Sequence, residues 1–185
     1  MNTLFDIAFI RSKHPCYDPT RYLPEGWKGS VKGILRHRDM PAKDKIWVVL
    51  RKDLLNDKTL RLFAVACARR ALAKVPNPDP RCIVACDVAD SFANGIATRE
   101  ELTLARAYAD DAYAAVYAVV YVAADAAAAR AAAYAATADV TADAAYYAAD
   151  ASAAAAAAAY ADYAAAAAYA ERQWQINHLI TLLEV

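Results

Sequence analysis

The chain has 185 residues and a formal net charge of zero, with 21 Lys and Arg against 21 Asp and Glu. This length fits one domain, or a short lead-in followed by one domain. Ala raises the hydrophobic fraction to 59%, and Asp residues interrupt the long apolar runs, so the composition excludes a membrane-spanning helix. The first residues, Met1 to Asp6, lack the basic and apolar regions of a signal peptide, which predicts a cytoplasmic protein.

Charge is divided unevenly along the chain. Residues 1–75 carry 16 Lys and Arg against 7 Asp and Glu, a net charge of +9, and residues 76–185 carry 5 against 14, a net charge of −9. Two interpretations stay open. Either one half binds a polar partner, or the two halves pack together within one chain or between two chains arranged head to tail.

Residues 1–41 are predicted to be an irregular lead-in, because they contain four of the seven Pro and three of the four Gly. The apolar run from Leu4 to Ile10 predicts a short strand or helix, and Ser30–Arg38 predicts one or two helical turns. Cationic side chains near Trp27 and Trp47 form a candidate surface for nucleic acid or an acidic protein. Its members are Lys28, Lys32, Arg36, Arg38, Lys43 and Lys45. The alternative is that Trp47 anchors the core and the cations form a solvated face.

Residues 42–97 predict a segment of three helices, at about residues 42–55, 57–74 and 80–94. Asn56 or Asp57 caps the second helix, and Asp79 followed by Pro80 fits the start of the third. Gly95 supplies the left-handed residue that ends the third helix. These boundary signals agree with one another.

Residues 98–185 predict long Ala-rich helices and a C-terminal helix that docks on the core. From Ala105 to Ala170, 39 of 66 residues are Ala, and neither Gly nor Pro follows Gly95. Thr98–Glu101 forms a capping box at the start. A single helix would be about 100 Å long, so we expect two or three antiparallel helices. The expected break is Thr137–Asp143, with Asp125 as a second option.

Two helical stripes carry large side chains. Tyr113, Tyr117 and Tyr121 lie on one face and are interpreted as core packing, with a ligand or ice contact as the alternative. In the last segment Trp174, His178 and Leu182 predict a face that docks against the helices before Pro76, with His178 as a packed core residue. Together the elements predict an all-α bundle of about five to seven helices.

No catalytic or metal-binding motif is present in the sequence. The four cysteines, at positions 16, 67, 82 and 86, lack the CxxC spacing and are interpreted as small buried thiols. The histidines at positions 14, 37 and 178 are scattered, and neither a Gly-rich phosphate loop nor a nucleophile elbow occurs. We therefore expect no enzyme, no cofactor and no metal site.

Several segments resemble the Ala-rich helical proteins of bacteria and bacteriophages that are labelled immunity proteins. The segments are Trp47–Arg51 (WVVLR), Leu60–Arg69 (LRLFAVACAR), Pro78–Arg81 (PDPR), Asp87–Asp90 (DVAD) and Ala93–Thr98 (ANGIAT) followed by Glu101–Leu102. The resemblance covers about residues 41–185 and rests on caps, a turn and packing faces. It implies a bacterial or phage origin and a role in conflict between them, and it supplies no catalytic residues.

These observations favour a non-enzymatic module that binds a protein, either a toxin or a host defence component such as a CRISPR nuclease. Its candidate acidic surface is Asp110, Asp125, Asp139 and Asp150, which could imitate the phosphates of a nucleic acid. The first alternative is nucleic-acid binding through the basic half. The second is ice binding, with Thr137 and Thr141 as the only Thr well inside the tract. A homodimer is expected if the Ala seams close between two chains.

Overall fold

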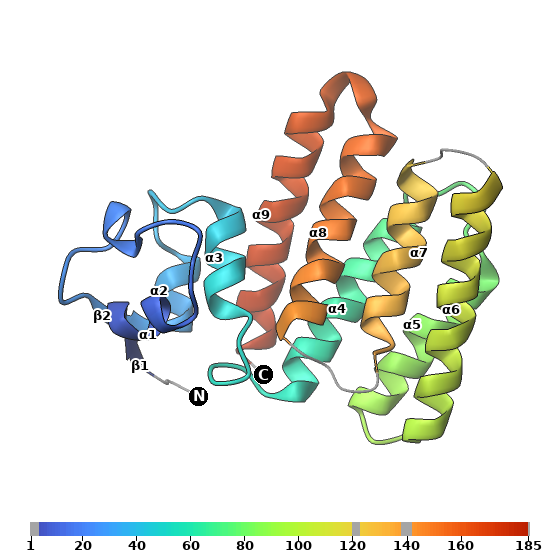
Figure 1. The fold of residues 1–185 in the computed structure, drawn as a ribbon, viewed down its shortest axis with the longest axis horizontal. Coiled ribbons are helices and arrows are strands. Elements are labelled where there is room, and N and C mark those ends of the chain that lie inside the picture. Colours follow the sequence, from blue (N-terminus) through green and yellow to red (C-terminus); the bar gives the residue numbers. More distant parts are fainter. Residues whose placement is uncertain (1–3, 120–122, 138–141, 185) are drawn as a thin grey trace.

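The computed structural model describes residues 4–119, 123–137 and 142–184. Those residues form an all-α bundle, which confirms the expected fold class, and seven of the helices follow residue 41 (Figure 1). The helices are α1 (Ile7–Ser12), α2 (Val31–Leu35), α3 (Ala42–Val49), α4 (Asp57–Leu72), α5 (Pro80–Ala93), α6 (Arg99–Val119), α7 (Ala123–Ala135), α8 (Ala142–Ala159) and α9 (Ala164–Leu182). Short 3₁₀ turns are η1 (Pro19–Arg21) and η2 (Ala161–Tyr163).

The helices are arranged in two layers. Helices α6, α7, α8 and α9 lie side by side in chain order, each packed against the next, and α4 and α5 lie behind them (Figure 1). Helix α4 packs against α7 and α8, and α5 packs against α6 and α7. Helix α3 lies on the outer side of α9, with the first strands and helices beyond it (Figure 1). Within the described residues, none of the helices has the length and apolar character that crossing a bilayer needs.

The lead-in contains more order than its Pro and Gly content predicts. Strands β1 (Leu4–Asp6) and β2 (Lys28–Ser30) pair antiparallel, with Phe5 opposite Gly29. A Cβ at Gly29 would lie 2.4 Å from the ring of Trp27, so only Gly fits beside that ring. Trp27 in turn contacts Phe5 edge to face, which packs the small sheet on its own aromatic cluster.

Most helix boundaries in residues 42–104 follow the predicted capping signals. Asn56 caps α4 by accepting from the Thr59 amide at 2.8 Å, and Gly95 has a φ of +73°. In the capping box of Thr98 and Glu101 the two residues exchange hydrogen bonds of 2.7 and 3.2 Å. These bonds lower the pKa of Glu101. Helix α3 is shorter than predicted, because the chain turns after Val49 instead of continuing to Leu55.

The described part of residues 98–185 forms three Ala-rich helices, α6, α7 and α8, followed by the C-terminal helix α9, in agreement with the prediction. The predicted break at 137–143 is confirmed, since α7 ends at Ala135 and α8 begins at Ala142. The second predicted option, Asp125, lies close to another boundary: α6 ends at Val119 and α7 begins at Ala123, which places Asp125 in the first turn of α7. A further turn at η2 separates α8 from α9 and was not predicted from the sequence. Tyr113 is half-buried against the core, as expected, whereas Tyr121 lies outside the described residues.

Two arginines close the C-terminal end of α7. The guanidinium of Arg61 is buried and donates to the carbonyl oxygens of Ala135 at 3.2 Å and Thr137 at 2.7 Å. Arg106 donates to the Thr137 hydroxyl at 2.7 Å. Helix ends leave carbonyl groups without intrahelical partners, so these contacts stabilise the end of α7. They also occupy Thr137, one of the two Thr considered for ice contact.

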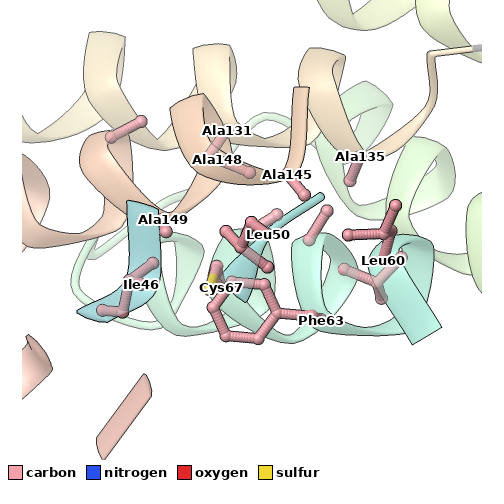
Figure 2. Close-up of a cluster of buried hydrophobic side chains, with 14 of the residues drawn as sticks. Ile46, Leu50, Leu60, Phe63, Cys67, Ala131, Ala135, Ala145, Ala148 and Ala149 are labelled. Carbon is pink, nitrogen blue, oxygen red and sulfur yellow. The ribbon is translucent and has the colours of Figure 1, made fainter. Parts of the chain in front are cut away.

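The core combines large side chains from one half of the chain with Ala from the other. Figure 2 shows Leu60, Phe63 and Cys67 of α4 next to buried Ala of α7 and α8. Ile46 and Leu50, from α3 and the turn after it, join the same cluster (Figure 2). Because Ala is small, the helix backbones approach closely and the large residues of α4 fill the space between them. The Ala tract therefore serves as one wall of a mixed core.

Candidate interaction surface

The predicted basic surface is only partly present as a surface. Lys28, Arg36, Arg38 and Lys43 are exposed and Lys32 is half-buried, but Lys45 is only 9% exposed. Burial also lowers the pKa of Lys45, so this residue contributes little to an exposed basic surface. Trp47 packs against the core and carries the guanidinium of Arg51 on its ring at 4.1 Å. The interpretation of Trp47 as a core anchor is the one that its burial supports.

The predicted acidic residues lie on separate helices. Asp110 on α6 forms an ion pair with Arg106 at 3.3 Å, and Asp150 on α8 forms one with Arg172. Asp125 lies in the first turn of α7, and Asp139 lies outside the described residues. Helix α7 lies between α6 and α8, so Asp110 and Asp150 belong to helices that are not direct neighbours (Figure 1).

The basic and acidic halves of the chain pair with each other. Arg69 on α4 contacts Asp87 at 2.9 Å and Asp90 at 2.6 Å on α5. Arg70 contacts Glu171 on α9 at 2.9 Å. These pairs cross from the basic half to the acidic half within one chain. Packing of the two halves on each other therefore accounts for part of the charge separation.

The hairpin of α8 and α9 carries three exposed tyrosines at or near its turn. Both helices extend beyond the adjacent ends of α3 and α7 (Figure 1). Tyr160 is 56% exposed, Tyr163 75% and Tyr169 66%, and we call these three residues the tyrosine tip. Residues 151–170 contain a single charged residue, Asp162, and consist otherwise of Ala, Tyr and one Ser. Exposed apolar patches of this kind mark interaction sites in monomeric proteins.

A buried polar network holds the base of this hairpin against α4. The carboxylate of Glu171 is 1% exposed and accepts from Arg70 Nε at 3.0 Å and Arg70 Nη2 at 2.9 Å. The Ser152 hydroxyl donates to the same carboxylate at 3.1 Å. Gln175 donates to Ser152 at 2.9 Å and to the Ala149 carbonyl at 2.8 Å. The network joins α4, α8 and α9, so it fixes the direction in which the tip projects.

An aromatic stack continues from this network to the surface. The guanidinium of Arg70 lies 4.1 Å from the Trp174 ring, and Trp174 stacks on His178 with ring centroids 5.0 Å apart. The predicted docking stripe of Trp174, His178 and Leu182 is therefore half-buried. The residues that are fully buried form a neighbouring stripe, offset by one residue: Glu171, Gln175 and Leu179. The helix docks on α3, α4 and α8, in agreement with the expected contact to helices before Pro76.

The pKa of His178 is lowered, first by burial and then by the charge of Arg70. In the folded protein it lies below the unfolded value of about 6.5, so the unfolded state binds more protons as the pH falls. The stability that neutral His178 contributes is thus complete above pH 6.5 and is lost as the pH falls through the lowered pKa.

We expect the free energy of unfolding to decrease between pH 7.5 and pH 5.5, and His178→Phe to show a smaller decrease. Phe keeps a ring against Trp174 but does not titrate. Urea unfolding at several pH values measures both slopes. An unchanged slope in His178→Phe would show that other groups cause the dependence.

The cysteines differ in how far solvent reaches their thiol groups. Cys16 is exposed, while Cys67, Cys82 and Cys86 are buried. Burial raises the pKa of Cys67, and raises those of Cys82 to about 11 and Cys86 to about 12. Across the described residues, no three His, Cys, Asp or Glu side chains gather in a way that could hold a metal ion.

A chromogenic disulfide reagent is expected to modify Cys16 alone in the folded protein at pH 8. The reactive species is the thiolate, and the other three thiols are both buried and held protonated. In denaturant all four cysteines of the sequence should react. Fast native reaction of a second thiol would contradict the burial of this part of the core.

Comparisons with protein-family models, curated proteins and solved structures return no match for this chain. The resemblance to immunity proteins thus stays a prediction. Sequence reasoning missed the exposure of the tyrosine tip and the burial of Glu171 and Gln175. The signal available for the tip was the spacing of Tyr160, Tyr163 and Tyr169 within an almost uncharged run.

Proposed function

We propose that this chain is a non-enzymatic, cytoplasmic binding protein that inhibits a partner protein as an immunity or anti-defence factor. The tyrosine tip is the observation that carries this proposal, and the resemblance to immunity proteins supplies the setting. Tyr is enriched at binding hot spots, because it provides a large contact area and a hydroxyl group at a small entropic loss. The partner is expected to present an apolar pocket with hydrogen-bond acceptors for the tyrosine hydroxyl groups.

Preorganisation of the hairpin strengthens the proposal. The ion pair of Arg70 with the buried Glu171 carboxylate fixes the base of α9, and Lys74, just after α4, lies 5.7 Å from the Tyr160 ring. A surface that is already rigid loses little conformational freedom on binding. The Ala residues around the tyrosines let a partner backbone approach α8 and α9 closely.

The test is a pull-down of the tagged chain from bacterial lysate, with and without nuclease, read by mass spectrometry. Three proteins are compared: the wild type, a Tyr160→Ala/Tyr163→Ala/Tyr169→Ala variant and a Tyr108→Ala control. Tyr108 is 47% exposed but lies on α6, away from the tip. We expect to capture a partner protein whether or not nuclease is added. The Tyr108→Ala control should capture the same protein, and the tip variant should not. Retention by the tip variant would place the interaction on another surface.

Nucleic-acid binding is the second candidate. It is favoured by Lys28 and Arg38, which are exposed and make no ion pair among the residues that the structure describes. If it is correct, affinity for a nucleic acid should fall steeply between 50 and 200 mM salt, because binding releases counterions. A Lys28→Ala/Arg38→Ala variant should then show a smaller salt slope. Loss of the captured material on nuclease treatment would also favour this candidate.

The expected homodimer is a separate question, which the molecular mass from analytical ultracentrifugation would answer.

A further inference from the structure

A groove lies where the first helices meet the start of α4 and the end of α9. Its volume is about 380 Å³, within the range of about 300–1,000 Å³ that small-molecule sites occupy. Residues from β2, α2, the turn after α3, α4 and α9 line it, so it forms at a junction of separate segments, where ligand sites often occur. It lies at the opposite end of α9 from the tyrosine tip and is independent of the proposed function.

One part of the lining is apolar. Val31, Leu54 and Leu55 are buried, while Leu62, Leu182 and Leu183 are half-buried. These aliphatic side chains come from four different segments and offer a surface for a hydrocarbon body rather than for a flat aromatic ring. Burying such a body removes apolar surface from water, which is favourable by about 25 cal/mol per Å².

The other part of the lining consists of hydrogen-bond donors. Lys32 and Lys58 contribute ammonium groups, and Ser30, Asn56 and Thr59 contribute hydroxyl and amide groups. The Asn56 oxygen already accepts from the Thr59 amide at 2.8 Å, which leaves the Asn56 NH₂ group to donate. Among the residues that the structure describes, the lining contains no carboxylate. Three other hollows, two beside α4 and α5 and one beside α5 and the start of α6, each include at least one Asp or Glu.

A carboxylate of the chain already lies at the edge of this groove. Glu184 Oε1 is 3.7 Å from Lys32 Nζ, and Glu184 itself is not part of the lining. The same oxygen lies 3.8 Å from Arg36 Nη2, so Glu184 shares its carboxylate between Lys32 and Arg36. Because the pair is largely exposed, it is weak and can be exchanged for a ligand.

We propose that the groove binds a small aliphatic carboxylate, with its chain against the leucines and its carboxylate group between Lys32 and Lys58. The charge of the lining selects an anion, and its aliphatic part selects an unbranched hydrocarbon. The N-terminus of α4, a helix of 16 residues, adds partial positive charge beside Asn56 and Lys58, and the nearby Asp57 carboxylate is paired with Lys52 at 3.5 Å. Glu184 competes with the ligand for Lys32.

Octanoate is the probe, and isothermal titration calorimetry is the measurement. 1-Octanol has the same chain without the charge, and acetate has the charge without the chain. We expect saturable binding of octanoate, weaker binding of octanol and none of acetate. Equal affinity for octanoate and octanol would overturn the role of the lysines, and absence of saturable octanoate binding would overturn the proposal.

Variants separate the two parts of the groove. Lys32→Ala/Lys58→Ala is expected to weaken octanoate binding by about tenfold and to leave octanol unchanged. Both lysines lie at least partly in solvent, so the fold is retained, and circular dichroism verifies this. Leu62→Ala removes part of the apolar lining and should weaken the binding of both octanoate and octanol.

A third variant tests the competition through the direction in which octanoate affinity changes. Glu184→Gln removes the competing carboxylate and should strengthen octanoate binding several-fold, whereas a decrease would contradict the assigned competition. The tyrosine tip variant should bind octanoate like the wild type. A negative pull-down, which would contradict the proposed function, can thus be told apart from a negative calorimetric titration, which would contradict the groove as a ligand site.

Discussion

Replacement of Arg70 by Met is expected to lower the free energy of unfolding by about 3–5 kcal/mol, because it leaves the Glu171 charge buried without its partner. The Glu171 side chain is 1% exposed, and only the Ser152 hydroxyl would then still donate to its carboxylate. Met keeps the apolar stem against Trp174, so the change reports mainly on the lost charge. Urea denaturation followed by circular dichroism measures the effect.

Arg69 provides a matched control one residue away. Its partners Asp87 and Asp90 are 62% and 31% exposed, so Arg69→Met should lower stability by about 0–1 kcal/mol. The double variant Arg70→Met/Glu171→Leu removes both charges and should recover much of the stability lost in Arg70→Met. Equal losses for Arg69→Met and Arg70→Met would mean that Glu171 reaches solvent in the folded protein.

A larger side chain in the Ala wall is the second severe change. Ala148 on α8 is 0% exposed and belongs to the buried cluster that faces α4 (Figure 2). Ala148→Leu adds three carbon atoms to a packed core and is expected to lower the free energy of unfolding by about 3 kcal/mol, the upper part of the usual range for overpacking. Thermal unfolding compared with the wild type measures the loss.

Ala154 lies on the exposed side of the same helix and supplies the control. Leu and Ala have similar helix propensity, so Ala154→Leu should change stability by no more than about 0.5 kcal/mol. If Ala148→Leu were equally mild, α8 and α4 would have to separate easily, and the close packing of the two layers would be wrong.

Local signals in the sequence predicted most of the helix boundaries. Asn56, Asp79 and Gly95 act through their own side chains or backbone dihedral angles, and each does so independently of distant residues. The break between α7 and α8 was also predictable, because β-branched and capping residues cluster there. The turn at η2 has Ala on both sides and no breaker residue, so propensity alone does not locate it.

The candidate site was harder to predict, because it depends on packing. Glu171 and Gln175 are polar residues that a helical pattern assigns to solvent, and only the approach of α4 and α8 makes their burial favourable. Tyr160, Tyr163 and Tyr169 have the composition of a core stripe, yet they are exposed because the hairpin extends beyond its neighbours. Composition identifies such residues as large and apolar, but does not say which of them a neighbouring helix covers.

The order in which α6 to α9 pack has a kinetic consequence. Each of these helices contacts the next one along the chain, so many of their contacts join neighbouring segments, whereas those with α4 join distant ones. Chains rich in local contacts fold quickly, within microseconds to milliseconds for helical bundles. The bond between Arg70 and Glu171 spans 101 residues, and loop closure of that length comes late. The Ala-rich hairpins should therefore form first, and docking of α9 on α4 should set the overall folding rate.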